Sequence, residues 1–146
     1  MIKQALQDFL IRDVNKLKEE IIHYKNENDL WIVKGEVKNS AGNLTLHLIG
    51  NLNHFIGAQL GKTGYVRQRD NEFSSKNILK EKLISDIDNV LAVIQKTLSG
   101  LKDDDLKKEY PIEFLGKKLT VGEMLLQITT HLNYHLGQIN YHRRLL

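Results

Sequence analysis

Two histidines near the end of the chain are the first residues whose type and spacing suggest chemistry. His131 and His135 lie in the segment Thr130-His131-Leu132-Asn133-Tyr134-His135-Leu136-Gly137-Gln138. In a helix, side chains four residues apart project from the same face and are separated by about one turn along the axis. Two neutral imidazoles in that arrangement can share a metal ion. The alternative interpretation is a pair of hydrogen-bonded histidines at the edge of the core.

A third ligand has to come from elsewhere, and His47 is the best candidate. It lies in the apolar run Leu44–Ile49, where a polar side chain is costly without a partner. His54 follows seven residues later on nearly the same helix face, but about 10.5 Å further along the axis. Both could not bind one ion together with a pair on another helix. We therefore favour His47 and keep His54 as the substitute.

The two remaining histidines have weaker claims. His142 follows His135 by seven residues, the same separation as between His47 and His54. It is therefore also too far along the helix to bind the same ion. His23 follows two isoleucines at the end of the first helical pattern and is expected at the surface.

Three neutral histidines would leave positions on the metal free for water or substrate. Closed structural zinc sites have four protein ligands, whereas three-ligand sites are typically catalytic. Imidazole binds several divalent metals; we place zinc and nickel first and keep iron and manganese as alternatives. On zinc, water ionises near neutral pH and a thiol is held as the thiolate.

Polar residues near the proposed ligands could orient them or a substrate. Asn51 and Gln138 each lie within about one turn of a candidate ligand, although Asn51 is equally compatible with an ordinary polar helix residue. Gly50 lowers helix propensity, which favours close packing or a polar role at that turn. No carboxylate is an obvious general base, and Glu36 and Glu123 qualify only if their segments fold over the site.

Hydrophobic spacing predicts the elements that must position these residues. Four helices are expected: from about Lys3 to Asn26, from an N-cap at Ser40 to between Gly57 and Gly61, from Ser74 or Ser75 to Gly100, and from a Thr120–Glu123 capping box to the C-terminus. Such a pattern predicts an all-α four-helix bundle, in which facing helices build metal sites.

The connections carry further expectations. Leu30–Glu36 is either a brief strand or a segment laid across the end of the bundle. The loop Gly61–Phe73 is long enough to return along the whole bundle, which would make the second and third helices parallel. The segment Tyr110–Thr120 is typical of a small hairpin before the last helix.

Composition limits the class of protein. The 146 residues are expected to form one domain, residues 1–146. Cysteine is absent, which excludes disulfides and thiolate ligands. No segment resembles a secretory signal or a membrane span, so a cytoplasmic protein is expected. The net charge of +3 comes from basic residues that alternate with acidic ones, which argues against a nucleic-acid-binding face.

Two segments together carry a family resemblance. Leu44-Thr45-Leu46-His47-Leu48-Ile49-Gly50-Asn51-Leu52, and about eighty residues later Thr130-His131-Leu132-Asn133-Tyr134-His135-Leu136-Gly137-Gln138-Ile139, resemble the DinB-like superfamily, including its bacillithiol-transferase-like members. The resemblance covers essentially the whole chain. It implies an up-down-down-up bundle, commonly dimeric, that binds a divalent metal through His47, His131 and His135.

The resemblance also implies a class of reaction. Characterised relatives are transferases or isomerases whose metal activates a low-molecular-weight thiol. We therefore expect a metal-dependent enzyme, a thiol-dependent transferase acting on small electrophiles, with a small-molecule substrate and a homodimeric assembly. The alternative is a metal-binding or metal-stabilised dimeric bundle without catalysis.

Overall fold

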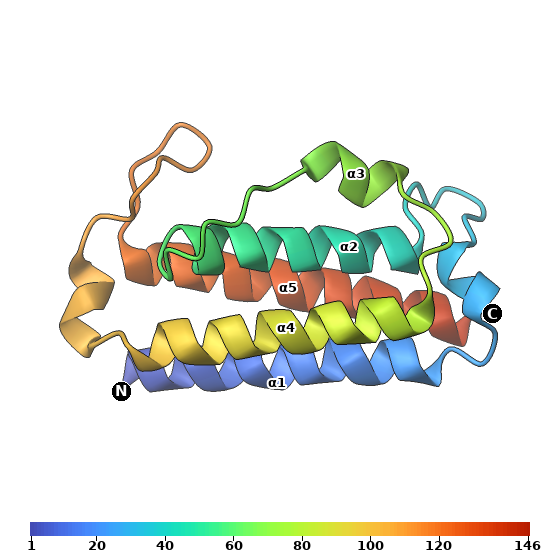
Figure 1. Cartoon of the computed structure of the whole chain (residues 1–146), viewed down its shortest axis with the longest axis horizontal. Helices are drawn as coiled ribbons and strands as arrows, with labels where there is room; N and C mark the ends of the chain where they lie inside the picture. The colour runs from blue at the N-terminus through green and yellow to red at the C-terminus, as the bar shows by residue number, and fades with distance from the viewer.

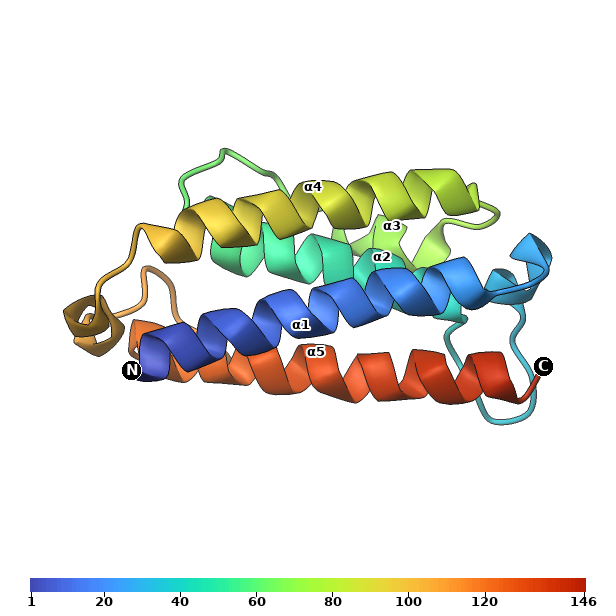
Figure 2. The same ribbon diagram turned by 90° about the horizontal axis from the view of Figure 1, so that it is seen from below.

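Four helices form the body of the protein. The computed structural model describes residues 1–146, and these helices are α1 (Ile2–His23), α2 (Ala41–Leu52), α4 (Lys80–Ser99) and α5 (Val121–Arg144). They lie side by side in both views, and α2 and α4 run opposite to α1 and α5 (Figures 1 and 2). No strand is present, so the predicted all-α class is confirmed. None of the helices has the length and apolar character that a membrane crossing requires.

The apolar stripes predicted from the sequence meet in one core. A cluster of 26 buried residues draws on all four long helices. On α1, Leu10 and Leu17 are fully buried, as are Leu83, Ile87 and Ile94 on α4. Each such side chain contributes about 1.5–3 kcal/mol to the free energy of folding. The buried faces of α2 and α5 belong to the same core, which packs these two helices against each other and brings their histidines together.

Helix α2 begins where the sequence predicts. The Ser40 hydroxyl accepts a hydrogen bond from the backbone N–H of Asn43 at 3.1 Å, which satisfies one free donor of the first turn. Helix α2 is buried on nearly all sides, because the crossover covers the face turned away from the core (Figure 1). It continues directly into η2, a π-helical stretch (Asn53–Ala58).

The crossover between α2 and α4 contains a short helix that the sequence did not predict. This helix, α3 (Arg69–Ser74), lies over α2 (Figure 1). The side-chain amide of Asn43 holds it there, because Nδ2 donates to the backbone oxygens of Glu72 at 3.0 Å and Ser75 at 2.8 Å. The amide of a buried asparagine thereby anchors α3 to α2.

The predicted start of the third long helix is wrong. Ser74 ends α3 and Ser75 follows it as the C-cap, whereas α4 begins only at Lys80. The backbone of Asn77 has φ 57°, a left-handed conformation that an α-helix cannot include. The Ser75 carbonyl is also engaged by Asn43 and turned toward α2. Neither feature is visible in the local sequence.

Smaller differences occur at the ends of the bundle. Helix α1 ends at His23, three residues before the predicted Asn26. The segment Leu30–Glu36 forms no strand; its first two residues belong to the 3₁₀ helix η1 (Glu27–Trp31), in which Leu30 is completely buried. A brief strand is therefore excluded, and the segment lies at the end of the bundle near the C-terminus (Figure 1).

The segment before α5 forms the predicted small hairpin, although it contains no regular strand. The 3₁₀ helix η3 (Asp103–Lys107) leads into it. Antiparallel pairing is limited to two isolated bridges, Glu109 with Thr120 and Phe114 with Lys117. The predicted capping box of α5 is confirmed, since Thr120 and Glu123 each bond the backbone N–H of the other.

Candidate metal centre

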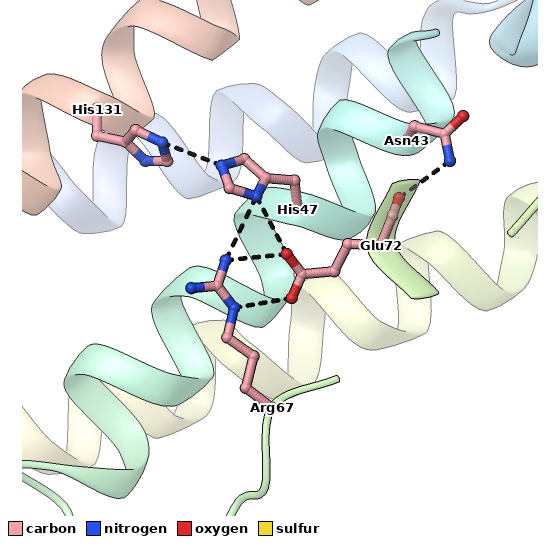
Figure 3. Close-up of polar contacts among 5 residues, drawn as sticks. All are labelled: Asn43, His47, Arg67, Glu72 and His131. Atoms are coloured by element: carbon pink, nitrogen blue, oxygen red, sulfur yellow. Dashed lines mark hydrogen bonds and ion pairs between the residues drawn. The ribbon is translucent and has the colours of Figure 1, made fainter. Parts of the chain in front are cut away.

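The structure brings the three predicted histidines together between α2 and α5. One ring nitrogen from each of His47, His131 and His135 lies within 4.8 Å of the others. The Nε2 atoms of His47 and His131 are 3.1 Å apart and face each other (Figure 3). Nitrogens bound to one tetrahedral ion are separated by about 3.4 Å, given metal–nitrogen distances near 2.1 Å. The spacing therefore suits a shared divalent ion after small side-chain adjustments.

Burial keeps two of these imidazoles neutral. It lowers the pKa of His131 to about 4, helped by its neighbours His135 and His47. Burial also lowers the pKa of His135, although the hydrogen bond to Gln138 acts in the opposite direction. Only a neutral imidazole has a lone pair to give to a metal. Both residues are therefore in the ligand form at neutral pH.

The buried carboxylate of Glu72, on α3, fixes the tautomer of His47. Oε1 of Glu72 lies 3.1 Å from Nδ1 of His47, so this nitrogen carries the proton and donates it (Figure 3). The lone pair of Nε2 then points toward His131. A carboxylate behind a histidine ligand orients the ring and raises its basicity in many metal sites.

Arg67 completes this arrangement from the crossover. Its Nε and Nη2 donate to the two oxygens of Glu72, both at 2.9 Å, as Figure 3 shows. Nη2 also lies 3.3 Å from Nδ1 of His47, but both nitrogens carry protons, so the carboxylate is the acceptor that they share. Burial by itself would raise the pKa of Glu72, yet the hydrogen bonds from His47 and Arg67 and the charge of Arg67 lower it. Glu72 therefore remains an ionised acceptor.

Gly50 makes room for Glu72. A Cβ atom at position 50 would lie 1.9 Å from Oε2 of Glu72 and 2.6 Å from its carboxyl carbon. Of the two explanations for a glycine inside this apolar helix, close packing is therefore confirmed. Sequence reasoning missed both Glu72 and Arg67, and Gly50 was the only signal that something approaches α2 closely at this turn.

Replacing Gly50 with Ala is expected to destabilise the protein by about 1–3 kcal/mol, although alanine favours a helix by up to about 1 kcal/mol. The carboxylate cannot move aside freely, because Arg67 and His47 both hold it. Gly137→Ala is the matched control, since a Cβ there meets nothing within 4 Å. It should stabilise the protein slightly. Urea denaturation of both variants measures the difference, and equal shifts for the two would contradict the close packing at Gly50.

The two predicted orienting residues behave differently. Oε1 of Gln138 lies 2.7 Å from Nδ1 of His135, so that nitrogen donates and Nε2 is left with its lone pair. Gln138 therefore acts on His135 as Glu72 acts on His47. Asn51 makes no hydrogen bond to the three histidines, and its buried Oδ1 has no partner. Nδ1 of His131 is likewise buried and unpartnered.

The other histidines lie outside the cluster. His54 belongs to η2 and packs against the ring of Phe55, 4.7 Å between centroids. Tyr24 donates to Nδ1 of His142 at 2.7 Å, and Nε2 of His142 donates to the backbone oxygen of Ile32 at 2.9 Å. His142 therefore ties the end of α5 to the segment after η1. His23 is exposed, as predicted.

Two cavities reach the three histidines from different directions. The larger, about 840 Å³, touches His135 and is bounded by residues 32–44 and the second half of α5; we call it the C-terminal cavity. The smaller, about 360 Å³, touches His47 and His131 beside Arg67 and Arg69; we call it the arginine cavity. Both provide room for a molecule next to the imidazoles.

The two acidic residues considered as bases are placed apart. Glu36 lines the C-terminal cavity together with His135. Hydrogen bonds from the backbone and side chain of Thr120 hold Glu123 in the capping box and lower its pKa. Only Glu36 therefore shares a cavity with the site.

The chain was compared with known families and with curated proteins. None of the curated proteins matches it. Over residues 2–146 it matches a family described as a protein of unknown function, DUF1572. Because this match includes every element that positions the three histidines, the chain belongs to the DUF1572 family.

Proposed function

We propose that this protein is an enzyme that uses one divalent metal ion held by His47, His131 and His135. The observation that supports it best is that one ring nitrogen from each of the three histidines, on two helices, lies within 4.8 Å of the others. In His47 and His135, an acceptor on Nδ1 leaves Nε2 free to bind. A ligand set of three histidines leaves coordination positions open, and two cavities lead to them.

The chain's own residues would act by binding and orienting. A divalent ion at the triad would supply Lewis acidity, lowering the pKa of a bound water or thiol. Glu72 and Gln138 hold the imidazole rings, while the cavities place a substrate against them. Arg67 keeps Glu72 ionised, so that His47 retains its proton on Nδ1.

The narrower proposal is a thiol-dependent transferase acting on small electrophiles. We propose zinc or nickel as its metal, with iron or manganese as the alternatives. Its support is the resemblance to the DinB-like superfamily at His47, His131 and His135, and two cavities suit a reaction of two substrates. We also propose that α1, α2, α4 and α5 form the up-down-down-up bundle of that superfamily. The directions of the four helices in Figure 1 agree with it. A homodimer is proposed on the same resemblance.

The second candidate function is a metal-stabilised bundle without catalysis. One observation favours it: an ion at the triad would join α2 to α5, and Glu72 would extend that link to the crossover. Such a protein would lose much of its thermal stability on chelation and would consume no thiol.

Metal analysis combined with a conjugation assay tests these functions. Protein purified without a histidine tag is analysed for metals, loaded with zinc or nickel, and assayed with bacillithiol, glutathione and coenzyme A against 1-chloro-2,4-dinitrobenzene. About one metal per chain and conjugation above the metal-free protein would support the transferase. Bound metal without conjugation, together with a lower melting temperature after chelation, would favour the structural role. Failure to bind any divalent metal would remove both.

A further inference from the structure

We propose that the arginine cavity binds the anionic group of a small substrate, a carboxylate or a phosphate. This inference deepens the proposed function and rests on it, because it names the class of molecule that would lie beside the metal. The cavity touches His47 and His131 directly, so a ligand of its size would reach the open side of the triad.

The charges around this cavity are all of one sign. Arg67 and Arg69 line it, and none of its lining residues is acidic. Glu72 neutralises Arg67 from outside the cavity, through Nε and Nη2. The third guanidinium nitrogen of Arg67, Nη1, points away from Glu72 and makes no protein hydrogen bond (Figure 3). It remains available to a ligand.

Arg69 is the uncompensated charge. It forms no ion pair with any carboxylate of the chain, and its guanidinium carbon lies 5.2 Å from the centroid of the Phe73 ring. Stacking on an aromatic ring restricts the side chain without using its N–H donors. A planar guanidinium with free donors matches the two oxygens of a carboxylate or phosphate.

Asn51 lies beside the same cavity and has an unsatisfied polar atom. The residue is only 8% exposed, and its Oδ1 is buried without a hydrogen-bond partner. A buried amide oxygen without a partner lowers the stability of the folded protein.

The apolar residues that line the cavity indicate the size and polarity of the rest of the ligand. Phe55 and Phe114 meet edge to face with centroids 5.7 Å apart, and Met124 adds a flexible apolar surface. A volume of about 360 Å³ suits a small molecule with a single ring or a short alkyl chain. The class that fits is therefore a small aromatic or aliphatic acid.

The C-terminal cavity is a poorer anion site. Lys34 and Lys38 line it, but Glu36 lies between them, whereas no acidic residue lines the arginine cavity. Mixed charges in water give little net attraction for an anion. The two cavities thus differ in chemistry, and the anionic substrate is assigned to the one beside Arg69.

Calorimetric titration with benzoate, phenyl phosphate and neutral benzamide tests the assignment. Zinc-loaded wild type is expected to bind an anion and to bind benzamide more weakly; the stronger of benzoate and phenyl phosphate identifies the anionic group. Arg69→Gln should weaken anion binding about 5-fold or more, and the variant should still bind zinc. Lys38→Gln removes the same charge from the other cavity and should change the affinity less than about 2-fold.

The outcomes separate this inference from the proposed function. If Arg69→Gln does not change the anion affinity, or if Lys38→Gln lowers it equally, the assignment of the anion to the arginine cavity is wrong. The proposed metal site would not be affected by that result. A protein that takes up no zinc would end the proposed function. In that case, anion binding by the metal-free wild type that is lost in Arg69→Gln would still support the cavity. If benzamide binds as tightly as benzoate and phenyl phosphate, the cavity does not select for an anion, and the inference is wrong for both the zinc-loaded and the metal-free protein.

Discussion

Replacing His131 with Ala is expected to weaken zinc binding by about 100-fold or more. Loss of a residue behind a metal ligand typically costs 10–100-fold, and loss of a ligand itself should cost at least as much. The fold should survive, because His131 is only half-buried and its Nδ1 has no partner in the protein. Competition with a chromophoric chelator measures the affinity, and circular dichroism checks the fold.

His54→Ala is the matched control for this experiment. His54 is also a half-buried histidine, in the stretch that continues α2, but it lies outside the triad. It should bind zinc as the wild type does. Equal zinc affinity in His131→Ala and His54→Ala would show that the cluster is not a metal site.

Replacing Glu72 with Gln is expected to lower both stability and metal affinity. The carboxylate faces three N–H groups, two from Arg67 and one from His47. The amide of Gln is close to isosteric, but it has only one acceptor oxygen, and its NH₂ group would face other donors. Arg67, whose side chain is 13% exposed, would lose its counter-charge. Breaking a buried pair from one side costs about 3–5 kcal/mol.

Metal affinity in Glu72→Gln should fall by about 10–100-fold, because Nδ1 of His47 loses the acceptor that fixes its tautomer. Glu20→Gln is the control, since Glu20 accepts from Asn140 and Arg143 away from the triad. It should lose stability without losing metal affinity. Urea denaturation and chelator competition are compared for both. Wild-type stability and affinity in Glu72→Gln would contradict the role of the carboxylate.

The ligand candidates could be predicted from the sequence because they follow local rules. A pair of histidines four residues apart shares a helix face whatever surrounds it. His47 was identified by its apolar neighbours, which only a buried face of α2 explains. Helix periodicity then required these faces to meet in the core. The same rules placed the N-cap at Ser40 and the capping box at Thr120.

Glu72 and Arg67 could not be predicted in the same way. Both lie in the crossover, where charged residues normally face solvent and no periodicity connects them with α2. Their positions depend on contacts between distant segments: Asn43 holds the backbone of α3, and Gly50 leaves space for the carboxylate. The start of α4 was misplaced for a related reason, because the left-handed Asn77 separates α3 from it.

The position of Glu72 on the crossover links two events that occur at different places. Glu72 is the only residue of α3 that forms a hydrogen bond with one of the three histidines. This bond stabilises the tautomer of His47 that can bind a cation. By thermodynamic reciprocity, a cation bound to that tautomer must stabilise the placement of α3 over α2. Occupancy of the triad would therefore slow amide hydrogen exchange across the crossover, a segment that would otherwise open locally more often than the four long helices.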